Sequence, residues 1–185
     1  LTAMKELLID SEIAKSKSDS KNTNELNSYE YQMYSQNGED GILSEIFRRL
    51  GITEGKFLEF GVQDGIQSNT TRLLILGWTG LWIEADRNHF ESIQNRFEKY
   101  LSLGKLQVVN RFVTVDNINS ILNEFSFATD FDLLSIDIDS NDFWVWKAIE
   151  SHQPKVVVIE YNAFYPPDTE WVIPYESDQI GRAHV

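Results

Sequence analysis

The stretch Phe57-Leu-Glu-Phe-Gly-Val-Gln-Asp-Gly65 decides the fold of this chain. Its apolar run carries one acid, Glu59, and then turns through Gly61 and Gly65 before a helix expected to begin near Ser68. A strand that ends in a glycine-rich turn and leads into a helix is the unit with which α/β proteins bind nucleotide-like ligands. The stretch therefore predicts a ligand-binding turn at the carboxyl end of a parallel strand.

The acid in this turn narrows the choice of ligand. The residues follow an E-x-G-x-x-x-G pattern rather than the G-x-G-x-x-G pattern of dinucleotide-binding proteins. A carboxylate at this place disfavours a pyrophosphate, but it suits an ammonium group such as the methionine end of S-adenosylmethionine. An equally good interpretation is that Glu59 is a buried structural residue capped by its own turn. The motif alone leaves both interpretations open.

Apolar strands alternate with helical patterns on both sides of the turn. We expect strands at 56–62, 80–84, 106–113, 131–138 and 155–161, and helices at 39–50, 68–76, 88–101, 118–125 and 142–151. The run Val156–Ile159 is continuous and β-branched, which is typical of a strand buried on both faces. Strands joined by crossover helices form a parallel sheet with right-handed connections. The fold class is therefore α/β, with a doubly wound, mainly parallel sheet.

Composition divides the chain into three regions. Residues 1–30 combine a helical pattern over 1–15 with a polar, linker-like stretch over 16–28. The α/β domain is expected to cover 31–167. The remaining tail, 168–185, ends in Gly-Arg-Ala-His-Val, which resembles nothing before it, so we expect a truncated or foreign end.

The charge of the chain limits its partners. Its 185 residues include 16 basic and 29 acidic side chains, a formal charge of −13, which disfavours nucleic acid and anionic membranes. No apolar run approaches the roughly 20 residues of a membrane helix. The absence of cysteine excludes disulfides and thiolate metal sites. We expect a cytoplasmic protein that binds a small molecule, with its oligomeric state left open.

In doubly wound sheets, ligands bind at the carboxyl ends of the strands, beside the point where the strand order reverses. Each predicted strand ends in acids or amides: Glu59, Glu84, Asp116, Asp137, Asp139, Glu160 and Asn162. Glu84, after the second strand, is placed to accept hydrogen bonds from both hydroxyls of a ribose. Asp116 is more simply explained as a helix cap. The strand ends together predict the site.

Three of these acids are candidates for catalysis. Removing a proton from an alcohol requires a carboxylate, a histidine or a metal, and Asp137, Asp139 and Glu160 stand at the right strand ends. Asp139 is the preferred base or metal ligand of the three. Asp139, Glu160 and Asn162 would also form an all-oxygen set suited to Mg²⁺ or Ca²⁺. The alternative is that these side chains cap the next helix or face water.

Several segments, taken in order, resemble FkbM-type proteins, which belong to the class I S-adenosylmethionine-dependent methyltransferases. They are YSQNGEDGIL (34–43), FLEFGVQDGIQSNT (57–70), GWTGLWIEAD (77–86), DLLSIDIDSNDFWVW (132–146) and VVVIEYNAFYPP (156–167). The resemblance implies a Rossmann-like methyltransferase fold that transfers a methyl group to a hydroxyl of a sugar or similar small metabolite. It also implies cofactor-binding roles: Glu59, Gly61 and Gly65 in the cofactor loop, Glu84 on the ribose and Asp116 near the adenine.

Two departures from the family pattern keep alternatives open. After the fourth strand the chain reads I-D-I-D-S-N-D where many relatives read I-D-V-E-G. The two further strands usual in class I methyltransferases have no counterpart in the pattern, so the fold is expected to be shortened at its C-terminus. One alternative is a catalytically silent domain that binds a nucleotide or S-adenosylmethionine. The other is a nicotinamide-dependent oxidoreductase, against which the missing third glycine and Glu59 both argue.

Overall fold

The computed structural model describes residues 24–161, 166 and 168–177. The helical pattern at 1–15, most of the linker-like stretch and Asn162 lie outside these residues. Leu26–Tyr29 forms a short 3-10 helix, η1, in the segment expected to be a linker. Across the described ranges, no helix is both long enough and apolar enough to span a membrane.

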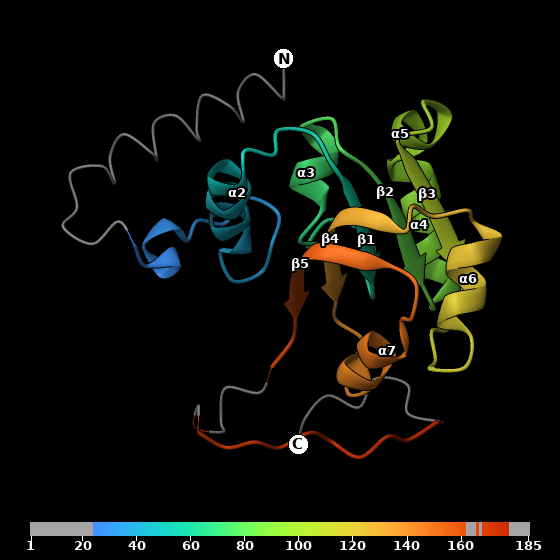
Figure 1. The fold of residues 1–185 in the computed structure, drawn as a ribbon. Coiled ribbons are helices and arrows are strands. Elements are labelled where there is room, and N and C mark those ends of the chain that lie inside the picture. The colour runs from blue at the N-terminus through green and yellow to red at the C-terminus, as the bar shows by residue number, and fades with distance from the viewer. Residues whose placement is uncertain (1–23, 162–165, 167, 178–185) are drawn as a thin grey trace.

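Five parallel strands form the centre of the molecule in the order β3-β2-β1-β4-β5 (Figure 1). They are β1 (Lys56–Phe60), β2 (Thr79–Glu84), β3 (Leu106–Asn110), β4 (Asp130–Ile136) and β5 (Gln153–Ile159). β1 pairs with β2 on one side and with β4 on the other, which places the reversal of strand order between β1 and β4. The predicted doubly wound, parallel α/β sheet is confirmed.

Helices cover both faces of this sheet. They are α2 (Glu39–Leu50), α3 (Thr71–Ile75), α4 (Arg87–Arg96), α5 (Glu98–Ser102), α6 (Ile118–Glu124) and α7 (Asp142–Ala148). Successive side chains of β1 point to opposite faces, so Phe57 packs with α2, α3 and α4, whereas Leu58 and Phe60 pack with α6 and α7. The sheet is thus enclosed between two apolar cores.

One expected helix is divided in two. The pattern at 88–101 predicted a single helix, but α4 ends at Arg96 and α5 begins at Glu98, with Phe97 non-helical between them. The Phe97 ring packs edge-on against Trp82, with ring centroids 4.9 Å apart. The break therefore lets one aromatic ring enter the core, a tertiary contact that helical spacing does not reveal.

The fifth strand is less enclosed than its sequence indicated. Val156–Ile159 is only partly buried, although its β-branched run is typical of strands buried on both faces. The cause is its position: in the described part of the chain, β5 pairs only with β4 and forms an edge of the sheet.

Gly61 sits where the chain leaves β1, at the reversal of strand order. Its φ is +73°, and a Cβ atom there would collide with the main-chain carbonyl oxygen of Asp137. Gly51, which ends α2, has a similar φ of +69° but has no atom within 4 Å of an added Cβ. The two glycines share a conformation and differ only in their surroundings.

We expect Gly61→Ala to lower the free energy of unfolding by about 3 kcal/mol, because it combines a left-handed alanine with a backbone collision. Gly51→Ala, the matched control, should lose only about 1 kcal/mol, the cost of the left-handed conformation. Urea denaturation of both variants measures the difference. Equal losses would mean that the approach of Gly61 to Asp137 is not close.

Candidate active site

A cleft of about 560 Å³ opens at the carboxyl ends of the strands. This volume lies within the range of sites for small molecules. Its walls come from the ends of β1, β2, β4 and β5, from the loop after β3 and from the loop before α2. The polar side chains among them are Gln36, Gln63, Glu84, Asp86, His89, Arg111, Asp137, Asp139, Asn141 and Glu160.

Two backbone amides hold the carboxylate of Glu84 in place. Its Oε1 accepts a hydrogen bond from the amide of Asp86, and its Oε2 accepts one from the amide of Gln63, both at 2.8 Å. Burial raises the pKa of Glu84, and these two amides act in the opposite direction. Because a carboxylate oxygen has two lone pairs, each oxygen can accept one more hydrogen bond from the cleft. The geometry suits a ligand with two adjacent hydroxyls.

Glu59 does not line the cleft. Its carboxylate is fully engaged by the protein: it accepts hydrogen bonds from Ser68 Oγ at 2.6 Å, from the Asn69 amide at 3.0 Å, from Ser135 Oγ at 3.1 Å, and from the amide and hydroxyl of Thr70. Burial raises its pKa, against these hydrogen bonds. Of the two sequence interpretations, the geometry favours the buried structural acid. The same contacts delay the start of α3 from Ser68 to Thr71.

Of the other residues expected to bind the cofactor, one lies at the cleft and two do not. Gly61 lines the cleft, where it lets the backbone approach closely. Gly65 does not: it faces the rings of Phe97 and Trp82, 2.7 and 2.9 Å from an added Cβ, so its glycine is needed for packing. Asp116, expected near an adenine, is also absent from the walls, which there consist of Arg111–Val113.

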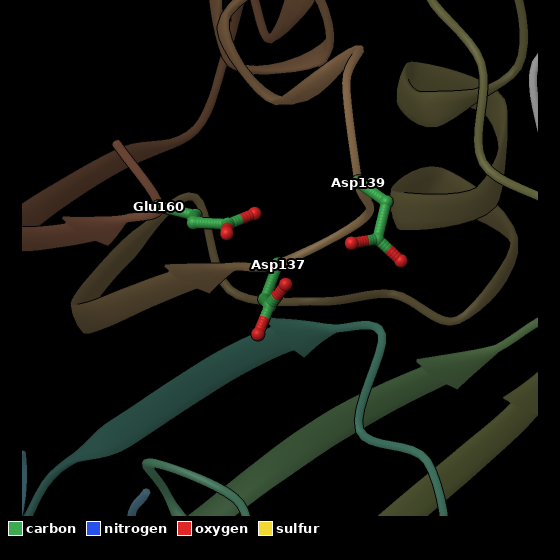
Figure 2. A group of neighbouring side chains, drawn as sticks. All are labelled: Asp137, Asp139 and Glu160. Atoms are coloured by element: carbon green, nitrogen blue, oxygen red, sulfur yellow. The ribbon is translucent and has the colours of Figure 1, made fainter. Parts of the chain in front are cut away.

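The acids at the ends of β4 and β5 come together as the sequence predicted. Asp137, Asp139 and Glu160 each offer a carboxylate oxygen within 4.8 Å of the other two (Figure 2). Desolvation in the cleft, followed by repulsion from Glu160 and Asp139, raises the pKa of Asp137 to about 7. These hard oxygen ligands also fit Mg²⁺ or Ca²⁺. Asn162, the third predicted metal ligand, lies outside the described residues.

Several wall residues lie outside the set of strand-end acids. His89 lines the cleft, with Nδ1 3.9 Å from Glu84 Oε1. Gln36 comes from the loop before α2. The buried carboxylate of Asp40 stabilises this loop, because it accepts hydrogen bonds from the backbone amides of residues 33–35. The acid at Asp40, two residues after the Asn37-Gly38 pair, was the available signal. Asn141 had no such signal.

The comparisons with known proteins bear on this fold. No family model matches the chain, and no curated protein matches it. Among solved structures, a Klebsiella pneumoniae protein described as an O-methyltransferase is similar, with a TM-score of 0.50 and 15% identity over 82% of this chain and 70% of that one. This likeness shows the fold: the chain has the Rossmann-like fold of methyltransferases.

Two further solved structures are similar at lower scores. The O-methyltransferase TomG of tomaymycin synthesis from Streptomyces achromogenes, in complex with S-adenosylmethionine, has a TM-score of 0.46 and 19% identity over 80% of this chain and 70% of its own. A Pyrococcus horikoshii protein described as an RNA methyltransferase has a TM-score of 0.45 and 17% identity over the same shares.

We expect Asp137→Asn to raise the melting temperature at pH 8. The pKa of Asp137 is raised from a usual 3.8 to about 7 in the folded protein, so the wild type loses stability as the pH rises through this window. Asparagine carries no charge at any pH, so the variant does not lose stability as the pH rises through this window. The increase in melting temperature should disappear near pH 4. Thermal melts followed by circular dichroism measure it at both pH values. Asp130→Asn, an exposed acid at the opposite end of β4, is the control, and an equal gain there would contradict the assignment.

Proposed function

We propose that this chain is an S-adenosylmethionine-dependent methyltransferase of the FkbM type that methylates a hydroxyl of a sugar or another small hydroxylated metabolite. One observation carries the proposal. Glu84 stands at the end of β2 in a cleft at the reversal of strand order, with each carboxylate oxygen held by one backbone amide and able to accept one more hydrogen bond. The fold supports it independently.

The cofactor half of the cleft lies at the ends of β1 and β2. There Glu84 would accept hydrogen bonds from the two ribose hydroxyls, and the walls at Ile83 and Phe112 provide apolar surface for a base. Gly61 allows the backbone to approach the sulfonium portion. The acids around the cleft favour a ligand with positive charges, as S-adenosylmethionine has at its sulfonium and ammonium groups.

The acceptor half lies at the ends of β4 and β5. Asp137 is the proposed general base, because a pKa of about 7 matches the working pH of a catalyst. With S-adenosylmethionine bound, the acceptor oxygen would form its bond to the methyl carbon as the carbon–sulfur bond breaks. The hydroxyl proton would pass to the Asp137 carboxylate, and S-adenosylhomocysteine would be the leaving product. Asp139 and Glu160 position the acceptor, and much of the acceleration comes from alignment of the two reactants.

A divalent cation such as Mg²⁺ would fit the same three carboxylates: Asp137, Asp139 and Glu160. Bound there, it would lower the pKa of a coordinated acceptor hydroxyl. The part of this chain in that arrangement is to hold the oxygen ligands in place, and the cation would reduce their mutual repulsion.

The cofactor is tested by calorimetry with S-adenosylhomocysteine. We expect binding by the wild type, and we expect Glu84→Gln to weaken it by about 1–3 kcal/mol through lost charge-assisted hydrogen bonds. Glu91→Gln, an exposed acid on α4, is the control and should bind normally. NADH should give no binding heat. Normal affinity in a folded Glu84→Gln variant would remove Glu84 from the site.

The reaction is tested by transfer of a radiolabelled methyl group to a panel of monosaccharides and other hydroxylated metabolites. We expect Asp137→Asn to reduce turnover by about 10²–10⁴-fold. The wild-type rate should rise with pH to a plateau above about 7, because the base must be ionised. Parallel melts with Mg²⁺, Ca²⁺ and EDTA test the cation, which should raise the melting temperature. Full turnover in Asp137→Asn would contradict its role as base.

A further inference from the structure

Asn141 makes an unusual pair of contacts for a residue at the start of a helix. It occupies the N-cap position of α7, but its side chain caps nothing there. Instead its Nδ2 donates a hydrogen bond to the carbonyl oxygen of Glu176 at 2.8 Å, and its Oδ1 accepts one from the Glu176 amide at 3.4 Å. Both ends of one buried side-chain amide thus bind the main chain of a residue 35 positions away.

A second side chain of α7 binds the same segment. Trp144 donates from Nε1 to the carbonyl oxygen of Ile173 at 2.8 Å. Figure 1 shows the segment, in red, running past α7. The main chain between 173 and 176 is therefore attached to α7 at two points.

The loop that precedes Asn141 is strained and needs support. Asp139 has a φ of +51° and Ser140 a φ of +128°, conformations that side chains with a Cβ rarely adopt. Asp142 holds this loop from one side, because its carboxylate accepts hydrogen bonds from the amides of Ile138 at 2.9 Å and Ser140 at 3.0 Å. Asn141, next to Ser140, connects the loop to the C-terminal segment on the other side.

We propose that Asn141 is a positioning residue for the acceptor half of the cleft. By binding the Glu176 main chain, it joins the segment 171–176 to the strained loop and keeps Asp139 beside Asp137 and Glu160. Asn141 itself lines the cleft, so the attachment is made at the wall it would stabilise. The role of this half of the cleft in binding an acceptor rests on the proposed function, whereas the attachment of Asn141 to Glu176 does not.

The chain offers a matched control. Asn119, on α6, binds the other end of α7 in the same way: its Nδ2 donates to the carbonyl oxygen of Ala148 at 2.7 Å, and its Oδ1 accepts from the Glu150 amide at 3.2 Å. Asn119→Ala removes an equivalent pair of hydrogen bonds without touching the C-terminal segment. Glu176→Ala is a second control, because the contact is to the main chain of Glu176.

Two measurements on the full chain test the attachment. The first is the rate of chymotrypsin cleavage after Trp171 and Tyr175, and the second is hydrogen exchange in the peptide covering 137–143, both under native conditions. Asn141→Ala should increase both rates about tenfold, because one buried two-point contact is lost. Trp144→Phe, which keeps the ring and loses the donor, should increase cleavage. Asn119→Ala and Glu176→Ala should change neither rate.

Cofactor binding and kinetics provide a third measurement, which would not change in this way if Asn141 had only a structural role. S-adenosylhomocysteine affinity should stay within about twofold in Asn141→Ala, while the KM for the acceptor from the methyl-transfer screen rises and the KM for S-adenosylmethionine does not. Unchanged cleavage or unchanged exchange in both Asn141→Ala and Trp144→Phe would overturn the attachment. If the wild type neither binds the cofactor product nor transfers methyl groups, the proposed function fails, and the two rates still decide the role of Asn141.

Discussion

The carboxylate of Glu59 is the interaction on which the site depends. It lies in the middle strand, 3% exposed, and gathers donors from Ser68, Asn69 and Thr70 on the turn and from Ser135 on β4. A buried carboxylate without these partners would cost several kcal/mol, so the turn can scarcely fold in any other way. By tying the turn at 68–70 to β1 and β4, Glu59 stabilises the two strands whose ends contribute to the cleft, without lining the cleft itself.

The acids of the site differ in how completely the protein satisfies them, and this difference separates their roles. Glu59 has donors on every side and stays structural. Glu84 has one backbone amide on each oxygen and keeps one lone pair of each for a ligand. Desolvation in the cleft, followed by repulsion from neighbouring acids, raises the pKa of Asp137 to about 7. Hydrogen-bond satisfaction therefore decreases from Glu59 to Glu84 to Asp137, and the capacity to bind a ligand or to accept a proton increases in the same order.

This order also explains what could be predicted from the sequence. Strand ends in a parallel sheet share one edge, so the meeting of Asp137, Asp139 and Glu160 followed from the alternation of strands and helices alone. The role of Glu59 did not follow, because a strand-end acid points into a core or into a cleft according to the pleat. The packing role of Gly65 did not follow for a similar reason, since the ring of Phe97 that it faces comes from the break between α4 and α5. Asn141 depends on a contact 35 residues away, which no local pattern contains.

The two halves of the cleft are consequently built in different ways. The half at β1 and β2 is defined by main-chain contacts around Gly61 and Glu84, which leave little freedom to the backbone. The half at β4 and β5 combines an edge strand with a strained loop at Asp139 and Ser140, and it is held by side chains that reach across from α7. Strain of this kind persists only where the surroundings hold it. Under the proposed function, binding of a constant cofactor requires the first construction, whereas adjustment to an acceptor is easier in the second. Selectivity for the acceptor would then depend on how firmly α7 and the C-terminal segment hold that loop.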